Sequence, residues 1–198
     1  MSGLEKATIS GFNEMLEKQK KLKGNALVSV VLFDDQTEVI YNRVPIRKTE
    51  SLNRKQYQTG GCTALLDALG SSIEHIGHLH HLLGSESPSH TIFIITTDGL
   101  ENASQEYTYD RVRHLIDLEQ KKYDWEFLFL GANIDAIGEA AKFGIHADHA
   151  VQFHNDREGI TRNYEGIGAA VSGLRMNGHL SHTWKENIEE DYRSRKGN

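Results

Sequence analysis

The chain has 198 residues, of which 38% are hydrophobic and 25% are charged, and its formal net charge is −6. This length suits one domain with a sizeable core, and this composition argues against disordered and membrane-embedded classes of protein. The net acidity argues against nucleic acid as a partner, because phosphate-binding surfaces carry a basic excess.

The cysteine content and the start of the chain bear on the compartment. Cys62 is the only cysteine, so no disulfide can form within the chain, and a reducing, cytoplasmic setting is expected. No run approaches the roughly 18 apolar residues of a membrane span. Residues 1–6 contain no apolar signal core, so the sequence predicts neither secretion nor a membrane partner.

The first elements predicted along the chain are a helix and a hairpin. Apolar residues at helical spacing, with Glu and Lys between them, predict an amphipathic helix over residues 3–22. The apolar, β-branched run at residues 26–33 predicts a buried strand. A turn at residues 34–36 and a second strand over residues 37–44 complete an antiparallel hairpin.

Strands and helices alternate after a polar connection at residues 45–58. Helices are expected over residues 64–83, 109–122, 134–143 and 161–174, and strands over residues 91–97, 126–130 and 150–153. From residue 175 the sequence is polar and charged, and a loose tail is expected. The predicted domain therefore covers residues 1–174, followed by a polar C-terminal tail over residues 175–198.

This alternation predicts an α/β fold with a mostly parallel sheet covered by helices on both faces. The hairpin adds one antiparallel strand. Ligands of such sheets bind at the carboxyl ends of the strands. Thr63, Asp98 and Asn133 all fall on loops that are expected at that edge.

Two loops carry the candidate site. The apolar run before Asp98 and Gly99 predicts a buried strand that delivers one carboxylate to the edge of the sheet. Upstream, Gly60-Gly61-Cys62-Thr63 precedes a predicted helix, which places the hydroxyl of Thr63 at a helix start. A hydroxyl and a carboxylate are suitable partial ligands for Mg²⁺, which prefers oxygen ligands and keeps several waters. A carboxylate of a partner protein could complete such a site.

These two motifs and the order of elements resemble a von Willebrand factor type A (vWA) domain. Residues 125–135 and 153–156 are similar to compact bacterial, intracellular members of that family, and the likeness covers residues 1–174. The resemblance implies a Rossmann-like three-layer fold. It also implies a metal-ion-dependent adhesion site with Thr63 as the second-loop ligand and Asp98 as the third-loop ligand, directly or through water.

The chain departs from the family at its start. Family members carry a central first strand that ends in Asp-x-Ser-x-Ser and runs into a sequence like residues 1–5. Neither the strand nor the element is present, which points to an internal start site or to truncation. With only Thr63 and Asp98 left of the family's ligands, Mg²⁺ is expected to bind weakly, if at all, and to stay mostly hydrated.

The missing strand would lie between the strands at residues 26–33 and 91–97. Each large apolar side chain of a central strand contributes roughly 1.5–3 kcal/mol, against a typical total stability of about 5–15 kcal/mol. Three outcomes are therefore open. The chain is marginally stable, the two flanking strands pair directly, or another molecule supplies a strand.

Simpler interpretations stand beside the site hypothesis. Thr63 and Asp98 could each cap a helix. Asp67 is expected in the first turn of its helix, where negative charge is favourable. Cys62 is expected to be a small buried hydrophobe. Glu101 and Asn102 lie near the site loop, with no ligand contact expected.

Simpler explanations also suit the histidines and the two aspartates of the hairpin. His75, His78 and His81 step along one polar helix face, which indicates a solvated surface rather than a Zn²⁺ site. Asp34 and Asp35 are most simply explained as the hairpin turn.

Three functions follow as hypotheses. The first is a non-enzymatic protein-interaction domain that binds an unknown protein through the Thr63/Asp98 face, with a degenerate metal site. The second is a metal-assisted hydrolase that uses Asp98 with Asp34 or Asp35. The third is a scaffold that binds without metal. The sequence contains no Gly-rich phosphate loop and no serine nucleophile elbow, which argues against catalysis.

Overall fold

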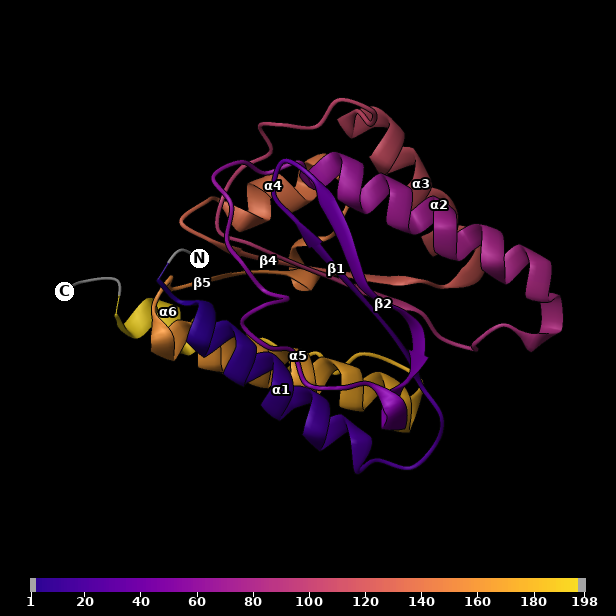
Figure 1. Ribbon diagram of the computed structural model, residues 1–198, viewed down its shortest axis with the longest axis horizontal. Helices are drawn as coiled ribbons and strands as arrows, with labels where there is room; N and C mark the ends of the chain where they lie inside the picture. Colours follow the sequence, from indigo (N-terminus) through magenta and orange to yellow (C-terminus); the bar gives the residue numbers. More distant parts are fainter. Residues whose placement is uncertain (1–2, 196–198) are drawn as a thin grey trace.

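The computed structural model describes residues 3–195 and arranges them in three layers, with the strands between two layers of helices (Figure 1). One helical layer holds α2 (Leu65–Leu83), α3 (Tyr109–Tyr123) and α4 (Ala136–Lys142). The other holds α1 (Glu5–Lys20), α5 (Arg157–Asn177) and α6 (Glu186–Ser194). The strands are β1 (Leu27–Phe33), β2 (Thr37–Pro45), β3 (Ile92–Thr97), β4 (Glu126–Ala132) and β5 (Ala150–Phe153).

The order of elements predicted up to residue 174 is confirmed, and most boundaries agree within two residues. The largest shift is at the start of α5, four residues earlier than expected. Asp156 accounts for it, because its carboxylate accepts a hydrogen bond from the backbone N–H of Gly159 at 2.8 Å and caps the helix. Gly178 ends the same helix in a left-handed conformation with φ of 78°.

The strands form two separate sheets. β3, β4 and β5 are parallel to one another, whereas β1 and β2 form the antiparallel hairpin. The predicted α/β class is confirmed, and the arrangement is compatible with a Rossmann-like fold, but the hairpin forms a sheet of its own instead of adding an antiparallel strand to the parallel sheet. Among the described residues, β1 and β3 share no strand pairing, so direct closure of the gap between them, one of the three expected outcomes, is wrong.

β4 is the centre of the core. Phe127 and Phe129 point to the side of α2, α3 and α4, while Leu128 and Leu130 point to the side of α5 and α6. All four side chains are fully buried. The alternation follows from the two-residue period of a strand, and burial on both faces explains why the strand is apolar throughout.

The segment after residue 175 differs from the expected loose tail. Leu180, Trp184 and Ile188 are buried and pack with β4 and α5. The indole N–H of Trp184 donates to the carbonyl of Asp148 at 3.2 Å. The tail prediction is therefore wrong as far as Arg195, because sparse apolar residues in a charged stretch are enough to dock this segment on the core.

Two ion pairs hold the end of α6 in place. The guanidinium of Arg195 binds the carboxylates of Asp156, which caps α5, and Asp191. The end of the described chain is thereby tied to the start of α5. No helix within residues 3–195 has the length and apolar character that crossing a membrane requires.

Candidate functional site

The carboxyl ends of β1 and β3 meet at residues 60–64. The backbone N–H of Ala64 donates to the carbonyl of Asp34, directly after β1, at 2.6 Å. Thr63 exchanges two bonds with Asn102, which lies beyond β3: its N–H donates to the side-chain oxygen at 2.9 Å, and its carbonyl accepts the backbone N–H at 3.0 Å. We call the surface formed by residues 34–36, 60–64 and 98–104 the rim.

The rim brings together the two residues predicted as ligands. A Cβ placed on Gly99 would lie 3.1 Å from the hydroxyl oxygen of Thr63, so this hydroxyl is next to the residue that follows Asp98. Both side chains are half-buried. The hydroxyl of Thr97 donates to the carbonyl of Gly99 at 2.9 Å, which fixes the turn after β3.

The capping interpretations of Thr63 and Asp98 are both wrong. α2 starts at Leu65 and has no side-chain cap, so the hydroxyl of Thr63 does not serve there. The next helix after Asp98 is α3, which begins at Tyr109 and is capped by Thr108, whose side chain accepts the backbone N–H of Arg111. The hydroxyl of Thr63 is thus placed at the rim without a capping role.

Glu101 holds the rim together from inside. Its two carboxylate oxygens accept four hydrogen bonds of 2.7–2.9 Å, from the backbone N–H groups of Leu66, Ala103 and Ser104 and from the Ser104 hydroxyl. Burial by itself raises the pKa of Glu101, but these bonds outweigh it and the pKa lies below its ordinary value. Because each oxygen already accepts two bonds, Glu101 offers no further ligand to a metal.

Asp67 fastens the next stretch of the same loop. It lies in the first turn of α2, as expected, and its carboxylate accepts the backbone N–H groups of Gln105, Glu106 and Tyr107 at 2.8–2.9 Å. Burial tends to raise the pKa of Asp67, but these three bonds lower it below its ordinary value. The sequence did not predict this role, since the partners lie 38 to 40 residues away.

Asp67→Asn is expected to destabilise the fold by about 1–3 kcal/mol at pH 7, because the charge-assisted bonds are lost. The folded-state pKa is depressed, so the carboxylate stabilises the fold above the unfolded value of about 3.9, and this contribution disappears as the pH falls through the folded-state pKa. Urea unfolding at pH 7 and near the folded-state pKa should therefore show the difference shrinking with acid.

Asp117→Asn is the matched control for that measurement. Asp117 is exposed and forms an ion pair with Lys121 on the surface of α3. Its replacement should change the free energy of unfolding by less than about 1 kcal/mol. Equal unfolding curves for wild type and Asp67→Asn at pH 7 would contradict the role assigned to Asp67.

Asp34 lies on the rim, and its carboxylate is hydrogen-bonded within the hairpin turn. Its side chain accepts the backbone N–H of Gln36 at 2.9 Å, which holds the pKa of Asp34 below its usual range. A Cβ on Gly60 would come within 2.4 Å of this side chain, so the loop can pass so close only with glycine there. The interpretation of residues 34–36 as a hairpin turn is confirmed.

The donor set of the rim does not fit a tightly held Mg²⁺. Thr63 and Asp98 are the two oxygen donors that the sequence predicts there, and Glu101 and the side-chain oxygen of Asn102 accept hydrogen bonds within the protein. Within residues 3–195, no three His, Cys, Asp or Glu side chains group closely enough to hold a metal ion. Near-octahedral Mg²⁺ would therefore depend on water for most of its shell.

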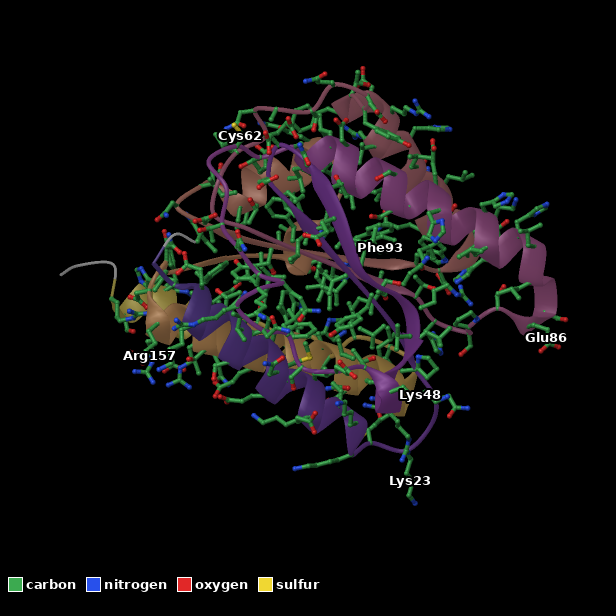
Figure 2. All side chains as sticks on the ribbon, viewed as in Figure 1. Lys23, Lys48, Cys62, Glu86, Phe93 and Arg157 are labelled. Atoms are coloured by element: carbon green, nitrogen blue, oxygen red, sulfur yellow. The ribbon has the colours of Figure 1, made fainter. Side chains whose placement is uncertain are left out.

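Asn133 and Cys62 complete the loops at this end of the molecule. Asn133 follows β4 in a left-handed conformation with φ of 56°, which asparagine tolerates better than most residues, and its side chain is exposed. Cys62 is exposed at the rim (Figure 2), so the expectation that it is buried is wrong.

The predicted histidine face is solvated. His75, His78 and His81 are exposed along α2, and His75 forms a hydrogen bond with Asn42. His80 is half-buried instead, with its ring edge-on to Trp125 at 5.2 Å. These side chains lie on a surface rather than in a cluster.

Comparison with known proteins adds no relative. No family model matches the chain, and no curated protein and no solved structure matches it either.

Proposed function

We propose that this chain is a non-enzymatic protein-interaction domain of the vWA type, which binds a partner protein through the rim. The observation that carries the proposal is the hydrogen-bonded rim itself. Asp67 and Glu101 fasten residues 101–107 to α2, so the loop beside Thr63 and Asp98 is ordered before any partner arrives. Such preorganisation reduces the entropy lost on binding.

The chemistry of the rim suits a protein partner. Leu100 follows Asp98 and Gly99 and is 50% exposed. An exposed apolar side chain next to a carboxylate and a hydroxyl combines burial energy with polar specificity, as interfaces do. The resemblance to vWA domains supports the same surface.

The metal site is proposed to be degenerate. With two oxygen ligands at the rim, we expect calorimetric titration with Mg²⁺ or Mn²⁺ to show no saturation at low-micromolar concentrations. The matched variant is Asp98→Ala. Low-micromolar binding to the wild type that is lost in this variant would contradict the prediction and would point to a working metal site.

The binding proposal is tested with the chain as bait. Proteins captured by the wild type should be lost with Thr63→Ala and with Leu100→Asp. Leu82→Asp is the control, because Leu82 is 66% exposed at the far end of α2. A partner that binds all variants equally would contradict a role for the rim.

The same experiment separates the alternatives. Capture that survives both a chelator and Thr63→Ala selects a metal-independent scaffold. Hydrolysis stays an alternative that needs a second carboxylate beside Asp98. Asp34, one of the two carboxylates that the sequence offers for this role, accepts a hydrogen bond from the backbone N–H of Gln36 in the turn. Metal-dependent turnover of a hydrolase substrate that Asp98→Ala abolishes would favour that alternative.

A further inference from the structure

A cleft of about 610 Å³ follows the line where α1 and α5 lie side by side (Figure 1). The two helices run in the same direction, because their contacts advance together along both. A Cβ on Gly11 would come within 2.4 Å of the ring of Tyr164. Two turns later, the side-chain amide of Gln19 donates to the hydroxyl of Ser172 at 2.7 Å. The described residues that line this cleft include none of the rim.

The residues that line the cleft recur every three or four positions along both helices. They include residues 4, 7, 11, 15 and 18 on the side of α1, and residues 157, 161, 164, 168 and 172 on the side of α5. This spacing forms a continuous seam along a helix, of the kind that packs against another helix. From residue 4 to residue 19 the seam is about 22 Å long, at roughly 1.5 Å per residue. A helix of about four turns therefore matches the cleft in length.

Small residues line the middle of the cleft. Ala7, Gly11 and Gly168 have at most a methyl side chain, and the half-buried Met15 contributes apolar surface beside them. The backbone of a further helix can approach α1 and α5 closely where their side chains are so small. A helix that enters the cleft therefore needs apolar side chains on the face that it presents there.

Exposed cations flank the cleft at both ends. Lys6 and Arg157 line it where the two helices begin, and Lys18 lines it near the end of α1. Figure 2 shows Arg157 at the start of α5, on the opposite side of the view from Lys23, which follows α1. Within residues 3–195, Lys6, Lys18 and Arg157 form no ion pair with a carboxylate. These cations are therefore available to the carboxylates of a partner.

The two acids between these cations have partners on their own helices. Glu14 accepts the hydroxyl of Ser10 at 2.9 Å, and Glu165 pairs with Arg162 at 3.2 Å. Along the cleft the charges therefore change from positive to negative and back to positive. The partner that complements this pattern carries carboxylates at both of its ends.

A second copy of the chain does not complement the cleft. A two-fold pair would bring the same cleft of each copy together, because such an interface uses one patch twice. If the copies were antiparallel, Lys6 and Arg157 would face Lys18 of the other copy. If they were parallel, like ends would face each other. Cations would meet cations in both cases, and such contacts disfavour association.

We propose that the cleft between α1 and α5 binds an amphipathic helix of a different protein. The bound helix is about four turns long, turns apolar residues toward the cleft and carries carboxylates at both ends. Its apolar face covers the seam, and its carboxylates pair with Lys6, Lys18 and Arg157. This interaction goes beyond the function proposed for the rim and does not depend on Thr63 or Asp98.

The test uses a synthetic probe as long as α1, which has 16 residues: Glu-Glu-Leu-Ala-Gln-Leu-Leu-Ala-Lys-Leu-Ala-Gln-Leu-Leu-Glu-Glu, with blocked ends and a fluorescent label. One control replaces its four glutamates by lysine, and another replaces its central lysine by proline, which breaks the helix. In fluorescence anisotropy, both controls should bind at least about tenfold more weakly than the probe. Binding of the probe should weaken as salt rises from about 0.05 to 0.5 M.

Variants of the protein locate the binding. Ala169→Trp fills the cleft at an exposed position of α5 and should abolish binding, whereas Met176→Trp, at a position that is 64% exposed outside the cleft, should not. Lys18→Glu should weaken binding at least about tenfold, whereas Lys121→Glu on α3 should leave it unchanged. Circular dichroism checks that each variant is folded.

Several results would overturn the proposal. They are absence of binding at low salt, equal binding of the probe and either control peptide, and full binding by the Ala169→Trp variant. A dimer of the chain in sedimentation experiments that Ala169→Trp dissociates would instead assign the cleft to a second copy.

Discussion

Trp184→Ala is expected to destabilise the protein by about 3–5 kcal/mol, the usual loss for a large aromatic side chain removed from a core. Trp184 is 3% exposed and packs with Ile188 in the cluster beneath β4. The substitution also removes the indole N–H that donates to the carbonyl of Asp148. Urea unfolding followed by circular dichroism measures the change as a shift of the midpoint.

Met176→Ala is the control from the same region. Met176 is 64% exposed near the end of α5, so its replacement should change the free energy of unfolding by no more than about 0.5 kcal/mol. If Trp184→Ala were equally mild, α6 would not be docked in solution.

Gly159→Ala is expected to destabilise the fold by about 1–3 kcal/mol or more, because the new methyl group has no space. A Cβ on Gly159 would lie 2.0 Å from the carbonyl oxygen of His154. The obstacle is backbone, which cannot rotate away as a flexible side chain would. Relief of the clash would displace the first turn of α5, where Asp156 caps the helix.

Gly168→Ala in the same helix should stabilise the fold instead. The atom nearest to its Cβ would be Cγ of Met15 at 3.5 Å, an ordinary van der Waals distance. Replacing glycine by alanine inside a helix is worth roughly 0.5–1 kcal/mol in backbone entropy, so this variant should melt at a higher temperature. Two variants that shift the melting temperature in the same direction would contradict the packing described for α5.

Within the candidate site, the sequence indicated that the two loops share one edge but not which hydrogen bonds hold them there. An apolar strand before Asp98 and a glycine pair before Thr63 are local patterns, and both loops do lie at one edge of the molecule. The structural roles of Asp67 and Glu101 depend on backbone groups that are distant in the sequence. No local sequence pattern around either residue predicts these hydrogen bonds.

The sequence by itself determined the order and type of the elements as far as residue 174, because periodicity and turn residues act between close neighbours in the chain. Only the tertiary structure decided that β1 and β3 do not pair with each other within residues 3–195, that Cys62 is exposed, and that Trp184 and Ile188 dock on the core. These outcomes depend on surfaces brought together from distant segments. Burial and pairing are properties of such surfaces, and a local stretch of residues does not encode them.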